Sequence, residues 1–338
     1  MNKIYFFTTI LFLTSMKLIA QTDVITGLDS PSGLLINGND LYIAEEGVIS
    51  KIDITDTSPT ATDVVTGLIA PFAMVLNGND LYFTERNKIS KIDITLMTPT
   101  AIDVVTGLNG PSGMALNGND LYFNQGNKIS KIDITATTPT AIDVLTGLGF
   151  PFGMTLNGAD LYFTQSDKIS KIDITATTPT ATDIVTGLDF PAEIILNGND
   201  MYITEGTKIS KINITEALPT ATNIITGLDF PYGMLLNGND LYFAENGKDK
   251  ISKLDLSTLS TGETAALSNG KLYPNPSPDF IQISGLSKAE NYTIYSALGT
   301  KINSGTVSVD EKINIEKLSK GPYFIKFETR HTFRFIKE

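Results

Sequence analysis

Residues 71–108 read PFAMVLNGNDLYFTERNKISKIDITLMTPTAIDVVTGL, and this stretch decides the fold. It is one copy of a unit that recurs along the chain with a period of 40 residues, most easily followed in its Thr-Gly-Leu triplet. The triplets begin at Thr26, Thr66, Thr106, Thr146, Thr186 and Thr226. A fixed period of this length is typical of a propeller, a solenoid or an array of repeats, so the repeat determines the architecture.

Each unit contains four short runs with the composition of β-strands. In the copy quoted above, the runs are residues 72–76, 80–84, 89–94 and 103–108. Apolar residues alternate along the third run, as a pleated strand requires. Asn77-Gly78 separates the first two runs and predicts a hairpin with a type I′ turn, which needs positive φ at both central residues. Pro99, between the third and fourth runs, ends the strand ladder there.

The two ends of the repeat array indicate a closed ring. The array begins with a lone fourth strand, residues 23–28, and its last copy, residues 231–256, lacks a fourth strand. The N-terminal strand can complete the last copy, which removes the unpaired edges that an open stack would expose. The sequence therefore predicts an all-β protein, a six-bladed β-propeller of four-stranded antiparallel blades. An open β-solenoid is the alternative, but it would need polar end caps that the sequence does not show.

The composition divides the chain into four parts. The first has a positive Lys3, a short apolar run and Ala20 before a predicted cleavage point, as in a secretory signal peptide. No other segment is long and apolar enough to predict a transmembrane helix. The last part has short alternating runs that predict a small C-terminal β-sandwich. The parts are the signal peptide 1–20, the propeller 21–256, the linker 257–270 and the C-terminal domain 271–338.

Charge and composition exclude several classes of function. The formal net charge is −12, and residues 21–270 carry 13 basic and 30 acidic side chains, so nucleic acid is not an expected partner. The chain has no cysteine, which excludes disulfides and thiolate metal sites. Its one histidine, His331, lies outside the predicted propeller, which therefore lacks the imidazole of a Ser-His-Asp triad or a histidine zinc site.

The loops of the repeats define two faces. The loops between strands one and two and between strands three and four share one face and are nearly invariant. The other loops share the opposite face, where the copies differ, and function on a scaffold usually lies in such loops. We call this the variable face and predict that it binds a ligand. Its candidate residues are Asp29, Ser32, Phe72, Asn109, Phe152, Asp189, Glu193, Asp229 and Tyr232.

A ring of acids and amides is expected at the edge of this face, at the end of each second strand. Its members are Glu45, Glu85, Gln125, Gln165, Glu205 and Glu245. Convergent carboxylates could hold Ca²⁺, a cation that takes six to eight oxygen ligands, or bind a sugar. The metal candidates are therefore Glu45, Glu85, Glu205 and Glu245. The structural alternative is that each side chain pairs with a neighbouring lysine such as Lys88 or caps a loop amide.

The C-terminal part resembles the sorting domain of the type IX secretion system of Bacteroidetes. The matching motifs are LYPNP at 272–276, Tyr295 with Leu298-Gly299, LSKGPY at 318–323 and FIK at 335–337. The resemblance implies interaction with the type IX machinery, export across the outer membrane, removal of the tail, and release or anchoring at the cell surface. The repeats also resemble NHL and gluconolactonase-like propellers, in their P-x-G-M, L-Y-F and K-I-S-K-I-D segments. That likeness implies the fold and transfers no site.

Two hypotheses of function follow, from different classes. The first is a non-catalytic binding module, secreted or at the outer-membrane surface, for a carbohydrate, a peptide or a surface protein. The alternative is a divalent-metal-dependent, lactonase-like hydrolase, for which Glu45, Asn109, Asp189 and Asp229 could supply ligands. The near-identity of the copies favours the binding module, because a tuned catalytic pocket needs asymmetry. A purely structural surface spacer is a third interpretation.

Overall fold

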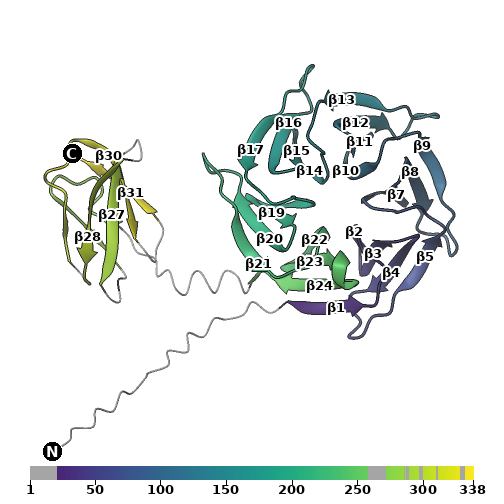
Figure 1. Ribbon diagram of the computed structural model, residues 1–338, viewed down its shortest axis with the longest axis horizontal. Coiled ribbons are helices and arrows are strands. Elements are labelled where there is room, and N and C mark those ends of the chain that lie inside the picture. The colour runs from purple at the N-terminus through teal and green to yellow at the C-terminus, as the bar shows by residue number, and fades with distance from the viewer. Residues whose placement is uncertain are drawn as a thin grey trace, which may run out of the picture. The chain divides into compact units, whose positions relative to one another are not determined.

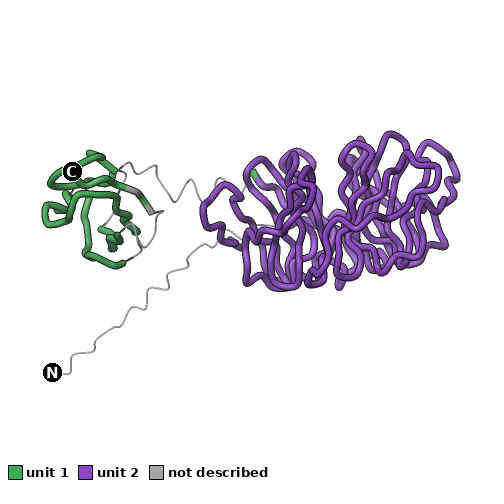
Figure 2. Tube along the Cα trace, turned by 90° about the horizontal axis from the view of Figure 1, so that it is seen from above, with its two compact units in different colours: residues 1–17, 257–338 green, residues 18–256 purple. Residues whose placement is uncertain are grey.

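The computed structural model describes residues 21–257 and, in the C-terminal part, residues 272–284, 286, 289–296, 300–309, 311–327 and 332–338. Contacts divide the chain into two compact units, one of residues 18–256 and one that begins at residue 257 (Figure 2). The predicted signal peptide, the linker residues 258–270, Leu298-Gly299 and His331 lie outside the described residues.

Residues 22–255 form six four-stranded antiparallel sheets that stand in a ring (Figure 1). We number them 1 to 6 by their first strands, which lie nearest the centre. The first strands are β2 (Leu34–Asn37), β6 (Met74–Asn77), β10 (Pro111–Asn117), β14 (Met154–Asn157), β18 (Ile194–Asn197) and β22 (Pro231–Asn237). The second strands are β3 (Asp40–Glu45), β7 (Asp80–Glu85), β11 (Asp120–Gln125), β15 (Asp160–Gln165), β19 (Asp200–Glu205) and β23 (Asp240–Glu245).

The remaining strands complete each sheet outward, in chain order. The third strands are β4 (Val48–Asp53), β8 (Lys88–Asp93), β12 (Lys128–Asp133), β16 (Lys168–Asp173), β20 (Lys208–Asn213) and β24 (Lys250–Asp255). The outer strands are β5 (Thr62–Thr66), β9 (Ile102–Thr106), β13 (Ile142–Thr146), β17 (Thr182–Thr186), β21 (Thr222–Thr226) and β1 (Thr22–Thr26). A 3₁₀ turn, η1 (Asn246–Lys248), lies between β23 and β24. The all-β class and the β-propeller architecture are confirmed.

Sheet 6 is built from both ends of the propeller sequence. Strand β1 pairs antiparallel with β24, with Thr22 opposite Lys253 and Thr26 opposite Lys250. The order of this sheet is β1-β24-β23-β22, so the chain's first described strand is its outer strand. The pairing joins residues more than 200 positions apart. With it, each of the six sheets in the ring has four strands.

The hydrophobic core lies between neighbouring sheets. Leu121 and Phe123 of β11 are fully buried, and they pack with Tyr82 and Ile89 of the preceding sheet. The repeated tyrosines are thus packing residues between sheets. A lysine of the third strand lies over most of these rings; Lys91 Nζ is 5.6 Å from the Tyr82 ring centroid. Burial on both faces explains why the second strands read as nearly continuous apolar runs.

The hairpin between the first two strands of each sheet differs from its predicted geometry. Asn77 pairs with Asp80, so the central residues are Gly78 and Asn79. Gly78 has φ 61°, whereas Asn79 is not among the residues with positive φ. The type I′ prediction was therefore wrong, because the positive φ falls only at the first central residue, as in a type II′ turn.

In four of the six sheets, a glycine before or within the first strand lies close against the next sheet. The Gly233 N–H donates to the Ser32 carbonyl across the junction of sheets 6 and 1, at 2.8 Å. A Cβ atom built on Gly233 would lie 2.0 Å from that oxygen. Gly33, Gly113 and Gly153 are equally confined, while Ala73 and Glu193 hold this position in sheets 2 and 5.

We expect Gly233→Ala to lower the free energy of unfolding by about 1–3 kcal/mol, because the added methyl group must push two backbones apart. Gly149→Ala is the matched control, since a Cβ there meets its nearest neighbour at an ordinary 3.7 Å. Urea denaturation followed by circular dichroism measures both variants. Equal stability of the two variants would contradict the close approach at Gly233.

The C-terminal unit consists of two sheets, β25-β26-β29 and β28-β27-β30-β31. Their strands are β25 (Leu272–Tyr273), β26 (Phe280–Ile283), β27 (Glu290–Ser296), β28 (Lys301–Val307), β29 (Ile313–Asn314), β30 (Gly321–Phe327) and β31 (Thr332–Lys337). One hydrophobic cluster contains residues of both sheets, among them Ile281, Ile294 and Ile325. Across the described parts of the chain, no helix is long and apolar enough to span a membrane.

Candidate functional site

The variable face is built by two sets of loops that hydrogen-bond to each other. After the second strand of sheet 2, the Arg86 N–H donates to the Ile69 carbonyl, which lies before the first strand, at 3.1 Å. The Gly126 N–H donates to Asn109 in the same way in sheet 3, at 2.8 Å. On the opposite face, the Ile94 N–H donates to Asn79 at 3.0 Å. The loops therefore lie on the two faces to which the sequence assigned them.

The ring of acids and amides caps these loops from within each sheet. Glu85, which is 2% exposed, accepts hydrogen bonds from the Ile69 N–H at 2.9 Å and the Ser90 hydroxyl at 2.7 Å. Gln125 accepts from the Asn109 N–H and donates to Ser130, so an amide serves the same purpose. Within the described residues, no group of three or more His, Cys, Asp or Glu side chains could hold a metal ion. The structure does not bring Glu45, Glu85, Glu205 and Glu245 together.

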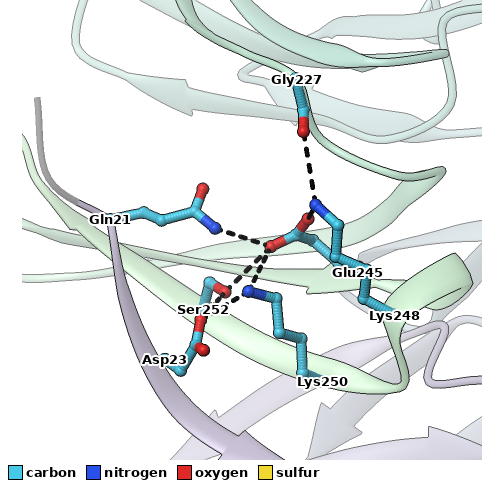
Figure 3. Close-up of polar contacts among 7 residues, drawn as sticks. All are labelled: Gln21, Asp23, Gly227, Glu245, Lys248, Lys250 and Ser252. Carbon is cyan, nitrogen blue, oxygen red and sulfur yellow. Dashed lines mark hydrogen bonds and ion pairs between the residues drawn. The ribbon is translucent and has the colours of Figure 1, made fainter. Parts of the chain in front are cut away.

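Glu245 differs from the other ring members because it takes part in the closure of sheet 6 (Figure 3). Its carboxylate is fully buried and accepts hydrogen bonds from Lys248 at 2.8 Å and from Gln21 at 2.9 Å. Lys250 Nζ lies 3.1 Å from Glu245 and 2.6 Å from Asp23 of β1. Burial raises the pKa of Glu245, but hydrogen bonds from Lys248 and Lys250 and the charge of Lys250 outweigh it, so the net pKa is lowered.

Lys250→Gln should lower the free energy of unfolding by about 3 kcal/mol, because it removes one cation from a buried carboxylate. The matched control is Lys128→Gln in sheet 3, where the ring member is the neutral Gln125 and the lysine pairs with the half-exposed Asp143. The free energy of unfolding of the control should fall by at most about 1 kcal/mol, because exposed ion pairs contribute no more than that. Chemical denaturation compares the two, and equal losses would mean that the closure network adds nothing.

Three of the predicted aromatic residues meet at the centre of the ring. The ring centroids of Phe72 and Phe152 are 4.9 Å apart, and Tyr232 lies 5.9 Å from Phe72 and 6.0 Å from Phe152. These residues come from sheets 2, 4 and 6, so rings from alternate sheets can touch only on the central axis. Ser32, Ser112 and Ala192 hold the same position in the other sheets and are buried. We call the three rings the aromatic triad; it fills the axis at this face.

The other predicted residues are spread around the face. Asp29, Asn109, Asp189 and Asp229 lie in four different sheets, one in each loop. The N–H groups of the first three donate to the ring acids or amides, at 2.8–3.2 Å. Ser32 donates to the Ala44 and Pro71 carbonyls and so ties sheet 1 to sheet 2. These positions frame the face and do not converge on one point.

Glu193 occupies the position that glycine or alanine holds in the other sheets. The side chain is partly buried, and its one described contact is a hydrogen bond that Oε1 accepts from the Ile194 N–H at 3.1 Å. Burial without an ion-pair partner raises the pKa of Glu193 to about 8. The neutral form of this carboxyl group is therefore favoured in the folded protein.

The raised pKa of Glu193 predicts a pH-dependent stability. The folded state holds this proton up to about pH 8, whereas the unfolded chain releases it near its ordinary value of 4.5. The stabilisation is complete below about pH 4.5 and is lost as the pH rises to about 8. The free energy of unfolding of Glu193→Gln should therefore rise relative to that of the wild type as the pH increases from 5 to 8. Denaturation at both pH values measures this difference. Glu216 is exposed, and Glu216→Gln is the control. If the stability of Glu193→Gln changed with pH in the same way as that of the wild type, the burial of the Glu193 carboxyl group would be contradicted.

Three functional candidates were missed by the sequence-based selection. Phe150, Phe190 and Phe230 precede the repeated prolines in sheets 4, 5 and 6 and are 82%, 76% and 59% exposed. Their φ angles are 51°, 47° and 46°, in the left-handed region that bulky residues avoid. Ser30, Ala70 and Gly110 hold this position in sheets 1 to 3. The only sequence signal was the repeated phenylalanine before proline, which says nothing of exposure.

A small apolar pocket opens between the loops of sheets 4 and 5. Its volume is about 250 Å³, and its walls include Phe150, Phe152, Phe190, Pro191 and Tyr232. Gln165, Ser166 and Ala192 complete the lining. Two members of the aromatic triad thus form one side of this pocket, and two of the exposed phenylalanines form its mouth. We call it the aromatic pocket.

Two larger grooves, of about 800 Å³ and about 460 Å³, run between outer strands and the next sheet. Their linings include residues 102–108 with residues 134, 136–141 and 143, and residues 183–188 with residues 218–221. Most of these residues, such as the Thr-Gly-Leu triplet, recur in every copy. The aromatic pocket is smaller, but its lining from sheets 4, 5 and 6 is not repeated around the ring, and it is the stronger candidate site.

The ring of four-stranded sheets places the larger unit in the class of β-propellers. Residues 271–337 match the family described as the secretion system C-terminal sorting domain. The resemblance of the C-terminal part to this family, read from its motifs, is confirmed. No curated protein sequence matches the chain.

Solved structures that resemble the chain are β-propellers of several activities. The nidogen/laminin complex has a TM-score of 0.56 at 15% identity, covering 65% of this chain and 90% of that chain. Virginiamycin B lyase from Staphylococcus aureus has a TM-score of 0.51 at 19% identity, covering 70% of this chain and 98% of that chain. A gluconolactonase from Xanthomonas campestris has a TM-score of 0.56 at 10% identity, covering 69% of this chain and 88% of that chain. At these identities the likeness extends to the fold alone.

Proposed function

We propose that the protein is an exported six-bladed β-propeller that acts as a non-catalytic binding module through its variable face. The C-terminal β-sandwich, residues 271–338, delivers it through the type IX secretion machinery. The match to a sorting domain supports export. Residues 1–20 serve as signal peptide in this scheme, and the mature protein is secreted or lies at the outer-membrane surface.

The three exposed phenylalanines before the prolines carry this proposal. A left-handed backbone at a residue with a side chain costs about 1–2 kcal/mol, which Gly110 avoids in sheet 3. Largely exposed aromatic rings add little stability to the folded chain, and exposed apolar patches usually mark interaction sites. Phe150, Phe190 and Phe230 thus combine strain with exposure, in three successive sheets of one face. The free energy of contact with a partner offsets both the backbone strain and the exposure of the apolar rings.

The contacts of the acids favour a binding module over a metal-dependent lactonase. Such a hydrolase needs carboxylates and amides that converge on one divalent cation. Glu45 instead accepts hydrogen bonds from the Asp29 N–H and from Ser50. Among the described residues, Asp189 and Asp229 belong to no group of three or more acids that could hold a metal ion.

The test exchanges the exposed phenylalanines in the full chain and measures binding to glycan and peptide arrays. We expect the triple variant Phe150→Ser, Phe190→Ser, Phe230→Ser to lose at least tenfold in binding, because the apolar contact area is removed. Its unfolding temperature should be unchanged, since serine already holds this backbone conformation at Ser30.

The matched control removes exposed apolar side chains that lie outside the variable face. Leu96, Met97 and Leu218 are 56%, 101% and 84% exposed in the loops between third and fourth strands. Their replacement by serine should leave binding unchanged. A phenylalanine variant that binds like the wild type, or equal losses in both triple variants, would overturn the assignment of the face.

A further inference from the structure

We propose that the aromatic pocket binds the side chain of an arginine carried by a peptide or protein segment. The inference rests on the proposed binding function of the variable face and names the ligand for it. Four observations carry the argument: the size of the pocket, the chemistry of its walls, the charge of the loops that line it and the exposure of its two outer rings.

The size of the pocket matches one side chain. Pockets for whole small molecules enclose roughly 300–1,000 Å³. The aromatic pocket encloses about 250 Å³ and is open at the variable face. A single long side chain that enters from a segment lying across sheets 4 and 5 would fill it.

The inner lining offers an apolar surface and few free hydrogen-bonding groups. Gln165 accepts from the Gly149 N–H at 2.9 Å and donates to Ser170 at 2.8 Å. The Ser166 hydroxyl donates to the Gly149 carbonyl at 3.0 Å. Among the lining side chains this leaves the Tyr232 hydroxyl as a partner, so most hydroxyl groups of a saccharide ring would lose water in this pocket without replacement, which is costly. The three methylene groups of an arginine have no such requirement and suit phenylalanine walls.

The loops that line the pocket carry negative charge that the described residues do not neutralise. Asp167 follows Ser166 in the chain, and Asp189 precedes Phe190; both side chains are exposed. Neither forms an ion pair in the described part of the chain, whereas Asp183 of the outer strand of sheet 4 pairs with Lys168 at 3.0 Å. An uncharged partner that covered these loops would desolvate both carboxylates without compensation. A cation offsets that cost.

The exposed rings favour arginine over lysine. The guanidinium group is planar, weakly hydrated and able to stack on an aromatic face, and it can bond a carboxylate through two N–H groups at once. Phe150 and Phe190 are 82% and 76% exposed beside the pocket, so their faces are free for stacking. The excess of acidic residues in the propeller part would also attract a basic segment.

The experiment uses the full chain and an array of pentapeptides with a variable central residue. Four central residues are compared in identical flanking sequences: arginine, lysine, leucine and citrulline, the uncharged isostere of arginine. We expect arginine peptides to bind at least tenfold more tightly than citrulline peptides. The best arginine peptide is then measured by calorimetry against the variants.

Phe190→Ser should weaken binding of the arginine peptide at least tenfold, and Asp189→Asn about three- to tenfold with a smaller salt dependence. Leu218→Ser, in a loop between third and fourth strands, is the control and should bind like the wild type. Equal binding of arginine and citrulline peptides, or no effect of Phe190→Ser on the arginine peptide, would overturn the inference.

The same variants on a glycan array separate the two proposals. Glycan binding that Phe190→Ser abolishes, without arginine-dependent peptide binding, overturns the arginine pocket and leaves the binding function standing. The absence of any phenylalanine-dependent binding on either array overturns both.

Discussion

Each sheet of the propeller buries both faces of its two middle strands, and so it needs a neighbour on each side. Leu121, Phe123 and their equivalents are fully buried only because the adjacent sheet covers them. A row of such sheets is stable only when its last member meets its first, since otherwise one apolar face at each end would remain in water. The pairing of β1 with β24 provides this closure, and Lys250 spans it by contacting both the buried Glu245 of β23 and the half-exposed Asp23 of β1.

Closure also limits what the centre of the ring can hold. The first strands approach until a glycine in one sheet lies against a carbonyl of the next. Six large side chains could not fit at this radius, so three aromatic rings alternate with two serines and an alanine. The triad is thus a packing solution as well as part of a pocket wall. Exchange of its rings would disturb the axis, which is why the outer phenylalanines are the cleaner probes of binding.

Local pattern was enough to predict much of this architecture, and long-range geometry was needed for the rest. The period and the alternation placed each strand of the quoted copy within about two residues, because both follow from the pleat of a single sheet. The turn type was missed because it depends on which pair of residues closes the hairpin. The triad joins residues 80 positions apart, Phe72 and Phe152, and no local pattern reports such a contact. The exposure and left-handed backbone of Phe150 likewise arise only once the loops are folded.

Near-identity of the copies would seem to exclude a specific site, yet a few side chains make the variable face asymmetric. Before the prolines, sheets 1 to 3 carry Ser30, Ala70 and Gly110, whereas sheets 4 to 6 carry phenylalanine. The framework cannot require the large residues, because the small ones serve equally well in the same backbone conformation. The aromatic half of the face is therefore a property added to the scaffold, and a partner that uses it must cover sheets 4 to 6 and leave sheets 1 to 3 largely free.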